Sequence, residues 1–344
     1  MKVFEGYEKG INLGGWLSQN DSSTKEHFES FITENDIKEI ASWGLDHVRV
    51  PVDYVVFEEE DGTPKEDGFA YITNCINWCK KYGLHMIIDL HKTYGYTFDP
   101  LDDADKEIFF HDEALQNRFI KTWEEIAARY GKYHDMVAFE LLNEIVSPNV
   151  VEEWNAIVKK VVPAIRKIAP DNYIVFGGVC YNNVTSIPGL IEPFADKLVY
   201  TFHCYDPLIF THQKAYWVQG MTKDFDMAYP DTVDVYREKS AAFSMELVGA
   251  INEHGITNIG PEMFEALFLP AIQTAKERNI PLYCGEYGVI DQAPLPDTVR
   301  WLADINRTFR KYNIGRALWT YKNKDFGIID PHYSDIKDEM IQLL

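Results

Sequence analysis

Two glutamates each stand at the end of a short apolar stretch in this 344-residue chain. Glu144 ends the segment Phe139-Glu-Leu-Leu-Asn-Glu144, and Glu286 ends the segment Pro281-Leu-Tyr-Cys-Gly-Glu286. Hydrolysis of an acetal needs one carboxyl group that protonates the leaving oxygen and a second that attacks carbon or activates water. Two glutamates brought face to face would suit this reaction. A carboxyl separation of about 5 to 5.5 Å would predict retention of configuration.

Further side chains that could bind a ligand also follow apolar stretches. Each stretch reads as a buried strand that ends in polar residues. If the strands are parallel and form a barrel, their carboxyl ends meet at one face, where barrel enzymes place their chemistry. We therefore expect these side chains to line one pocket with the two glutamates: Arg49, His91, Asn143, His203, Tyr205 and Trp319.

The scaffold that would bring these strand ends together can be predicted from the pattern of the chain. Eight short apolar segments alternate with segments of helical periodicity, which is typical of parallel βαβ units. A doubly wound sheet rarely needs eight such units. We therefore predict a single α/β domain over residues 1–344, a (β/α)8 TIM barrel. Its strands are expected at 10–16, 47–52, 86–91, 139–144, 173–176, 198–203, 281–286 and 317–321.

Residues 206–261 interrupt this alternation. The stretch has many aromatic residues and no clear strand, and it is too long for a plain loop in a compact domain. We predict that it forms a small subdomain inserted after strand six, over the C-terminal face of the barrel. Within it, Trp217 is a candidate platform for a distal sugar, with a packing role as the alternative.

Composition and charge limit the possible partners. The chain is 46% hydrophobic and 25% charged, as in a globular protein with ample core. Its formal net charge of −21 would repel a phosphate backbone, so nucleic acid is an unfavourable partner. No apolar run approaches the roughly 20 residues of a membrane span. We expect neither nucleic acid nor a membrane as a partner.

Cysteine usage bears on the compartment. Five cysteines are an odd and sparse set, which suits a reducing environment. The first residues contain no apolar segment of the kind found in signal peptides. These features predict a cytoplasmic protein, unless a signal peptide has been removed upstream. A polysaccharide substrate would favour secretion instead.

Several motifs in family order resemble glycoside hydrolase family 5, in the clan A group of retaining barrel glycosidases. Within the family, the chain is most similar to clostridial endoglucanases that carry a subdomain inserted after strand six. The resemblance spans nearly the whole chain and is therefore far more specific than one Asn-Glu pair. It rests on Gly10-Ile-Asn-Leu-Gly-Gly-Trp16, His47-Val-Arg-Val-Pro51, Asp89-Leu-His91, Leu141-Leu-Asn-Glu144, Phe202-His-Cys-Tyr205, Gly285-Glu-Tyr-Gly288 and Trp319.

The resemblance implies a cofactor-free enzyme that cleaves β-1,4 or mixed β-1,3/1,4 glucans with retention. It implies that Glu144 is the general acid/base and Glu286 the nucleophile. It also implies that Asn143 binds the sugar 2-hydroxyl, and that Arg49 and Tyr205 keep Glu286 ionised and oriented. Three further residues would contact the sugar or line its pocket: His91, His203 and Trp319.

Alternatives remain open on the sequence alone. The polymer could be β-1,3-glucan, mannan or xylan, or the barrel could bind carbohydrate without cleaving it. Lys92 stands where the related pattern has a second histidine, which bears on substrate preference. Glu140, deeper in its strand, is expected to be a paired structural acid, and Arg49 could serve it instead of Glu286. Metal catalysis is disfavoured, because strand one lacks the His-x-His pair usual in metal-dependent barrel hydrolases, so no metal is expected.

Overall fold

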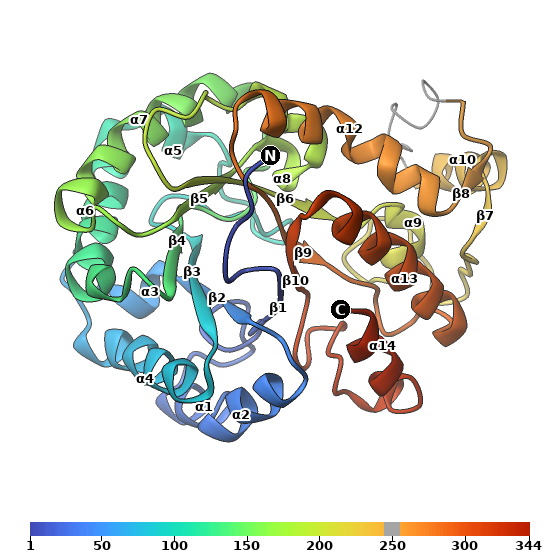
Figure 1. The fold of residues 1–344 in the computed structure, drawn as a ribbon, viewed down its shortest axis with the longest axis horizontal. Helices are drawn as coiled ribbons and strands as arrows, with labels where there is room; N and C mark the ends of the chain where they lie inside the picture. The colour runs from blue at the N-terminus through green and yellow to red at the C-terminus, as the bar shows by residue number, and fades with distance from the viewer. Residues whose placement is uncertain (244–254) are drawn as a thin grey trace.

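The computed structural model describes residues 1–243 and 255–344, and it contains the predicted barrel. Eight parallel strands close in the order β1-β10-β9-β6-β5-β4-β3-β2, and helices surround them (Figure 1). The α/β fold class and the TIM-barrel prediction are confirmed. The barrel strands are β1 (Lys9–Asn12), β2 (His47–Asp53), β3 (His85–Lys92), β4 (Val137–Glu140), β5 (Ile174–Gly177), β6 (Leu198–Cys204), β9 (Leu282–Tyr287) and β10 (Gly315–Leu318).

Each of the longer helices buries apolar residues. Helix α2 begins with a capping box, in which Asp36 accepts from the backbone N–H of Thr33, and helix α4 ends at Gly83 with a φ of 75°. The longer helices are α2 (Glu34–Ser42), α4 (Glu66–Tyr82), α6 (Glu113–Tyr130), α7 (Val151–Ile168), α12 (Pro261–Glu277) and α13 (Leu295–Tyr312). Shorter ones are α1 (Lys25–Ser30), α3 (Tyr54–Phe57), α5 (Ile108–His111) and the C-terminal α14 (Lys337–Leu343).

Strands β1, β4 and β10 end earlier than the sequence pattern predicts. Strand β4 ends at Glu140, so Asn143 and Glu144 belong to the loop that follows it. The chain stays near the barrel axis there because Leu141 N–H donates to Val175 O on one side, and Asn143 N–H donates to Leu90 O on the other. Strand β10 likewise ends before Trp319. The apolar pattern continues past the ends of β4 and β10 because the loop residues that follow them are also buried.

The connection between β5 and β6 has no long helix. It consists of the four-residue turn α8 (Val179–Asn182) and the 3-10 helix η3 (Val184–Gly189), which packs against α12. The N-terminal segment closes the barrel at the face where the strands begin. There Phe4 and Tyr7 pack in one cluster with Tyr283 and other residues from the strand interiors.

The segment after β6 departs from plain alternation. Its described part contains α9 (Leu208–Thr211), α10 (Val233–Ala241) and an antiparallel pair, β7 (Asp231–Thr232) with β8 (Asn258–Ile259). The pair lies at the edge of the molecule, outside the ring of helices (Figure 1). Tyr229 connects this segment to α13, because its hydroxyl donates a hydrogen bond to Asp304 at 2.8 Å. Residues 244–254 of the predicted subdomain lie outside the described part.

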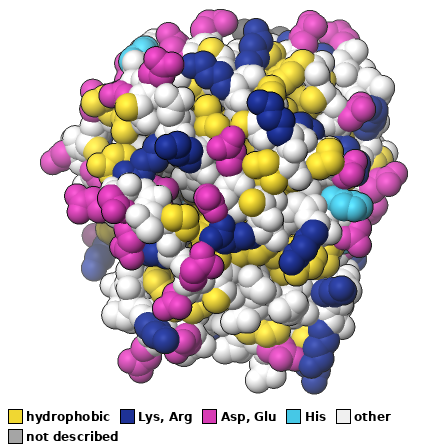
Figure 2. Space-filling view, turned by 90° about the vertical axis from the view of Figure 1, so that its left-hand side faces the viewer, with side chains coloured by type: hydrophobic (Ala, Val, Ile, Leu, Met, Phe, Trp, Pro, Cys, Tyr) yellow, Lys and Arg dark blue, Asp and Glu magenta, His cyan; other side chains and the backbone are white. Residues whose placement is uncertain are grey.

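The surface carries mixed charge. On the face drawn in Figure 2, acidic and basic side chains are interspersed, and hydrophobic side chains are scattered between them. Among the described helices, none has the length and apolar character needed to cross a bilayer.

Candidate active site

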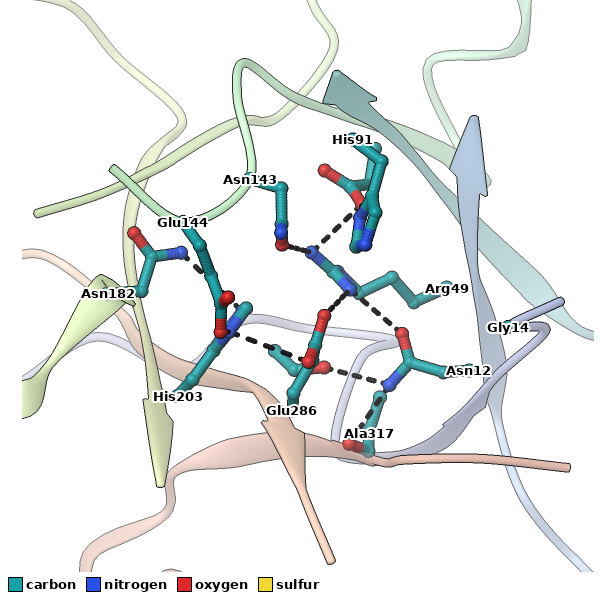
Figure 3. A network of polar contacts seen from close by, with 12 residues as sticks. Asn12, Gly14, Arg49, His91, Asn143, Glu144, Asn182, His203, Glu286 and Ala317 are labelled. Atoms are coloured by element: carbon teal, nitrogen blue, oxygen red, sulfur yellow. Dashed lines mark hydrogen bonds and ion pairs between the residues drawn. The ribbon is translucent and has the colours of Figure 1, made fainter. Parts of the chain in front are cut away.

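The structure brings the predicted site residues other than Trp217 together at the carboxyl ends of the strands, and Figure 3 shows several of them. Four come from barrel strands: Arg49 on β2, His91 on β3, His203 on β6 and Glu286 on β9. The others lie just beyond strand ends: Asn143 and Glu144 after β4, Tyr205 after β6 and Trp319 after β10. Convergence arises because parallel barrel strands all end at one face.

Glu286 is held by two donors, one on each carboxylate oxygen. The Arg49 guanidinium donates to Oε1 at 2.8 Å, and the Tyr205 hydroxyl donates to Oε2 at 2.9 Å (Figure 3 shows the Arg49 contact). The Glu286 carboxylate is almost fully buried, so these two hydrogen bonds replace its contact with water. A fixed, ionised carboxylate is the state that a nucleophile needs.

Glu144 faces Glu286 across the pocket. His203 lies between them, with its Nδ1 atom 2.8 Å from Oε1 of Glu144 and 3.7 Å from Oε2 of Glu286. Single ligating atoms of these three residues all lie within 4.8 Å of one another. Inverting glycosidases separate their carboxyl groups by about 6.5–9.5 Å to admit a water molecule, whereas retaining enzymes need about 5–5.5 Å. The observed spacing fits retention.

The two carboxyl groups differ in how they hold a proton. Burial and the charge of Glu286 raise the pKa of Glu144 well above its usual range. Burial also raises the pKa of Glu286, but the Arg49 cation and the Tyr205 hydrogen bond counteract that rise. A single proton shared by the pair therefore resides on Glu144. Such a difference between two neighbouring carboxyl groups suits one to act as the acid and the other as the carboxylate.

Arg49 is the central cation of a buried acidic cluster. It pairs bidentately with Glu140, at 2.8 and 2.9 Å, and contacts Asp89 at 3.0 Å. Glu140 is therefore the paired structural acid that its depth predicts. The two roles considered for Arg49 are not alternatives, since the same guanidinium binds Glu140 and Glu286. Burial raises the pKa of Asp89 and of Glu140, each to about 7, because one cation only partly compensates these carboxyl groups.

Replacing Arg49 with methionine should destabilise the fold strongly. The variant leaves Asp89, Glu140 and Glu286 buried without a cation, and breaking a buried pair in this way costs about 3–5 kcal/mol. Urea unfolding followed by circular dichroism measures the loss. Lys25→Met is the matched control, because it removes a surface cation from an exposed pair with Glu29 and should change stability by less than about 1 kcal/mol. Equal midpoints for the two variants would contradict this role of Arg49.

His91 and Trp319 form one wall of the pocket. Their rings are parallel within 4°, with centroids 5.9 Å apart. His91 also contacts Asp89, at 2.5 Å through Nδ1, and burial lowers its pKa to about 3, so the ring is neutral. A β-carbon on Gly14 would lie 2.9 Å from the Trp319 ring, so this glycine makes room for the indole.

Trp217 lies further out, in the inserted segment. It is partly exposed and stands edge-on to His212, with ring centroids 6.0 Å apart. His212 in turn stands edge-on to Tyr205. Trp217 is therefore connected to the Glu286 pocket through two aromatic rings and is not in it. Trp301, a residue of α13, is fully buried.

Sequence reasoning overlooked two residues that orient this site. Asn12 accepts from Arg49 through Oδ1 and donates to Gly285 O at 2.9 Å, next to Glu286. The Tyr96 hydroxyl donates to Glu144 O at 2.7 Å and accepts from Val146 N–H at 2.9 Å. Asn12 could have been predicted as a site residue from its place in the Gly10–Trp16 motif. Tyr96 could not, because its partner Glu144 lies 48 residues away and no motif surrounds it.

Glu144, His203 and Glu286 are also the three described residues whose atoms lie close enough to ligate a metal. The charge distribution disfavours this use, because Arg49 already donates to Glu286 at 2.8 Å and would repel a divalent cation. The absence of a metal stays a prediction.

Comparisons with known proteins agree with this geometry. A family model described as Cellulase (glycosyl hydrolase family 5) matches residues 8–325. Endoglucanase C of Acetivibrio thermocellus is 38% identical over 98% of both chains. The chain belongs to glycosyl hydrolase family 5. This membership makes it a glycoside hydrolase and confirms the family resemblance read from the motifs.

Two other similar proteins extend the comparison for this family 5 chain. Cellodextrinase A of Ruminococcus flavefaciens is 42% identical, covering 90% of this chain and 84% of its own. The crystal structure of endoglucanase Cel5A from Thermotoga maritima superposes with a TM-score of 0.76, covering 98% of this chain and 97% of that one. At 22% identity, that structure supports the barrel fold alone.

Proposed function

We propose that this family 5 enzyme is a retaining endo-β-glucanase that cleaves β-1,4 or mixed β-1,3/1,4 glucans by double displacement. The observation that carries the proposal is the pair Glu144 and Glu286, whose ligating atoms lie within 4.8 Å of each other and which differ in their hydrogen-bond donors. The names of two relatives, endoglucanase C and cellodextrinase A, support a β-glucan as the substrate.

The first step joins the enzyme to the sugar. Glu286 attacks C1, the C1–O bond breaks, and its electron pair goes to the leaving oxygen, which takes the proton of Glu144. In the second step Glu144 removes a proton from water, which attacks C1 and releases Glu286. Asn143 is suited to bind the 2-hydroxyl: its Oδ1 accepts from Arg49 at 3.0 Å, and its buried Nδ2 has no partner among the described residues. Trp319 would lie beneath the sugar.

A panel of polysaccharides with sizing of the products tests this function. We expect carboxymethylcellulose and mixed-linkage β-glucan to be cut internally, so that viscosity falls before much reducing sugar appears. Preferential cleavage of β-1,3-glucan, mannan or xylan would show that the proposed substrate is wrong, while the proposed mechanism would still stand. Absence of any hydrolysis would point to a non-catalytic carbohydrate-binding barrel. Proton NMR of the first products should show the β-anomer.

The pH profile should be bell-shaped, with its basic limb above the usual range of a carboxyl group. Activity requires ionised Glu286 and protonated Glu144, so it rises as the first loses its proton and falls as the second does. Burial and the charge of Glu286 raise the pKa of Glu144. Glu286→Gln removes that charge, so the pKa of Glu144 should fall, as 13C NMR of labelled glutamate can measure. An unchanged value would contradict this coupling.

Trp217→Ala should affect long substrates and spare short ones. If the partly exposed indole is a distal platform, KM for cellohexaose should rise several-fold, because stacking on a sugar face is lost. An aryl cellobioside, which is too short to reach it, should keep its KM. Tyr216→Ala is the control, since this neighbouring ring is 78% exposed and stands edge-on to Trp217. Equal effects on both substrates would assign Trp217 to packing.

A further inference from the structure

Three consecutive residues after β5 adopt a left-handed backbone conformation. The φ angles are 56° for Cys180, 58° for Tyr181 and 54° for Asn182. Non-glycine residues rarely enter this region, and then usually singly, because the β-carbon approaches the backbone carbonyl. A run of three persists only where its surroundings over-determine it, which makes the contacts of this turn informative about function.

The turn contacts both the backbone and the side-chain partner of Glu144. Tyr181 N–H donates to the carbonyl of Ile145, the residue after Glu144, at 2.9 Å. The Nδ2 atom of Asn182 points at Nε2 of His203, 3.5 Å away, as Figure 3 shows. His203 in turn contacts Glu144 through its other nitrogen, Nδ1, at 2.8 Å. Asn182, His203 and Glu144 thus form a line of side chains that ends at the proton donor.

Asn182 has little freedom to leave this line. Its side chain is fully buried, and a β-carbon on Gly177 would lie 2.4 Å from Oδ1, so the amide occupies space that only glycine leaves open. Oδ1 has no hydrogen-bond partner among the described residues. The contact with His203 is therefore the polar interaction that orients the amide.

The geometry limits the position of the histidine proton. Burial lowers the pKa of His203 well below its usual range, so the ring is neutral and carries one N–H. An amide N–H directed at Nε2 requires that atom to accept, which leaves the ring proton on Nδ1. The Nδ1–H group then donates to Oε1 of Glu144. Because Oε1 accepts this bond, the acidic proton of Glu144 resides on Oε2.

We propose that Asn182 is a positioning residue that keeps the His203 proton on Nδ1 and thereby keeps the acidic proton of Glu144 on Oε2. This inference rests on the proposed function, in which Glu144 protonates the glycosidic oxygen. When C1–O cleaves and Glu286 bonds to C1, the proton passes from Oε2 to the leaving oxygen, and the Nδ1–H bond stabilises the charge left on the carboxylate.

Two substrates separate a defect in proton donation from a general defect. Cellotetraose needs a proton on its leaving sugar, whereas 2,4-dinitrophenyl β-cellobioside releases a phenolate that needs none. In Asn182→Ala and in the isosteric Asn182→Asp, kcat/KM for cellotetraose should fall about 10- to 100-fold, a part of the roughly 10²- to 10⁴-fold contribution of a general acid. The value for the dinitrophenyl substrate should stay within about 3-fold of the wild type.

Cys180→Ala is the matched control, because it alters an exposed side chain of the same turn and leaves the asparagine amide. Both of its kcat/KM values should equal those of the wild type. Equal losses on the two substrates in the Asn182 variants would assign this residue to structure alone. An absence of loss on cellotetraose would equally overturn the proposal.

The histidine proton can also be located in the unmodified enzyme. Two-bond 15N–1H correlation spectra of histidine-labelled protein distinguish the two tautomers, and His203→Gln identifies the signal. We expect the Nδ1–H tautomer in the wild type and its loss in Asn182→Asp, whose carboxylate would accept from Nε2. An Nε2–H tautomer in the wild type would overturn the proposal. This spectrum decides the matter even if the Asn182 variants do not fold, or if no glucan is cleaved and the proposed function fails.

Discussion

Replacing Glu286 with alanine should lower kcat on β-glucan by about 10⁴-fold or more, as expected for a residue without which the covalent step cannot occur. Azide should restore turnover of a substrate with a good leaving group, because the small anion fits the space vacated by the carboxylate. It attacks C1 from the same face as Glu286 would, so the product is an α-glycosyl azide with inverted configuration. Proton NMR of the purified azide measures that configuration.

The control for this experiment is a glutamate outside the pocket. Glu265 lies on α12 and pairs with Lys311 at the surface, so Glu265→Ala should keep wild-type activity. Circular dichroism should show that both variants are folded. A Glu286→Ala enzyme with normal turnover, or one that forms a β-glycosyl azide, would contradict the nucleophile assignment.

Replacing Glu144 with alanine should have an effect that depends on the leaving group. On β-glucan we expect kcat to fall about 10²- to 10⁴-fold, the usual contribution of general acid catalysis. Formation of the glycosyl-enzyme from 2,4-dinitrophenyl β-cellobioside should be nearly unaffected, because that leaving group needs no proton. Its hydrolysis then becomes slow without a base, so a burst of phenolate precedes a slow steady state. Stopped-flow absorbance measures both phases.

Azide distinguishes the two glutamates by product configuration. In Glu144→Ala it replaces the general base, attacks the glycosyl-enzyme and gives a β-glycosyl azide with net retention. Glu140→Gln is an informative contrast. Glu140 is fully buried and pairs bidentately with Arg49, so this change should act mainly on stability. A Glu144→Ala enzyme that loses activity equally on every substrate would not be missing a general acid.

The local sequence pattern was sufficient to predict the barrel strands and most of the side chains that meet at their carboxyl ends. Strand periodicity predicted the barrel, and the polar residue at each strand end predicted which side chains meet. This inference works because parallel strands in a closed sheet end at one face. It was less accurate at strand boundaries, where buried loop residues such as Leu141 and Leu142 continue the apolar pattern beyond the last strand residue, Glu140.

The shared use of Arg49 was not visible in the sequence. Pairing with Glu140 and support for Glu286 read as alternatives, because a pattern along the chain does not show how many acids one guanidinium reaches. The five N–H donors of an arginine can serve several acceptors, and only the barrel interior brings Asp89, Glu140 and Glu286 around it. Arg49 favours the charged form of Glu286, and that charge together with burial raises the pKa of Glu144.

The sequence by itself determined the barrel, the two glutamates Glu144 and Glu286 at the strand ends, and the family to which the chain belongs. These depend on residue types at strand ends and on the order of motifs. Only the tertiary structure decided the carboxyl spacing, the donors that bind Glu286, and the turn that places Asn182 beside His203. Such contacts join residues far apart in the chain, and distances and proton positions depend on packing in three dimensions.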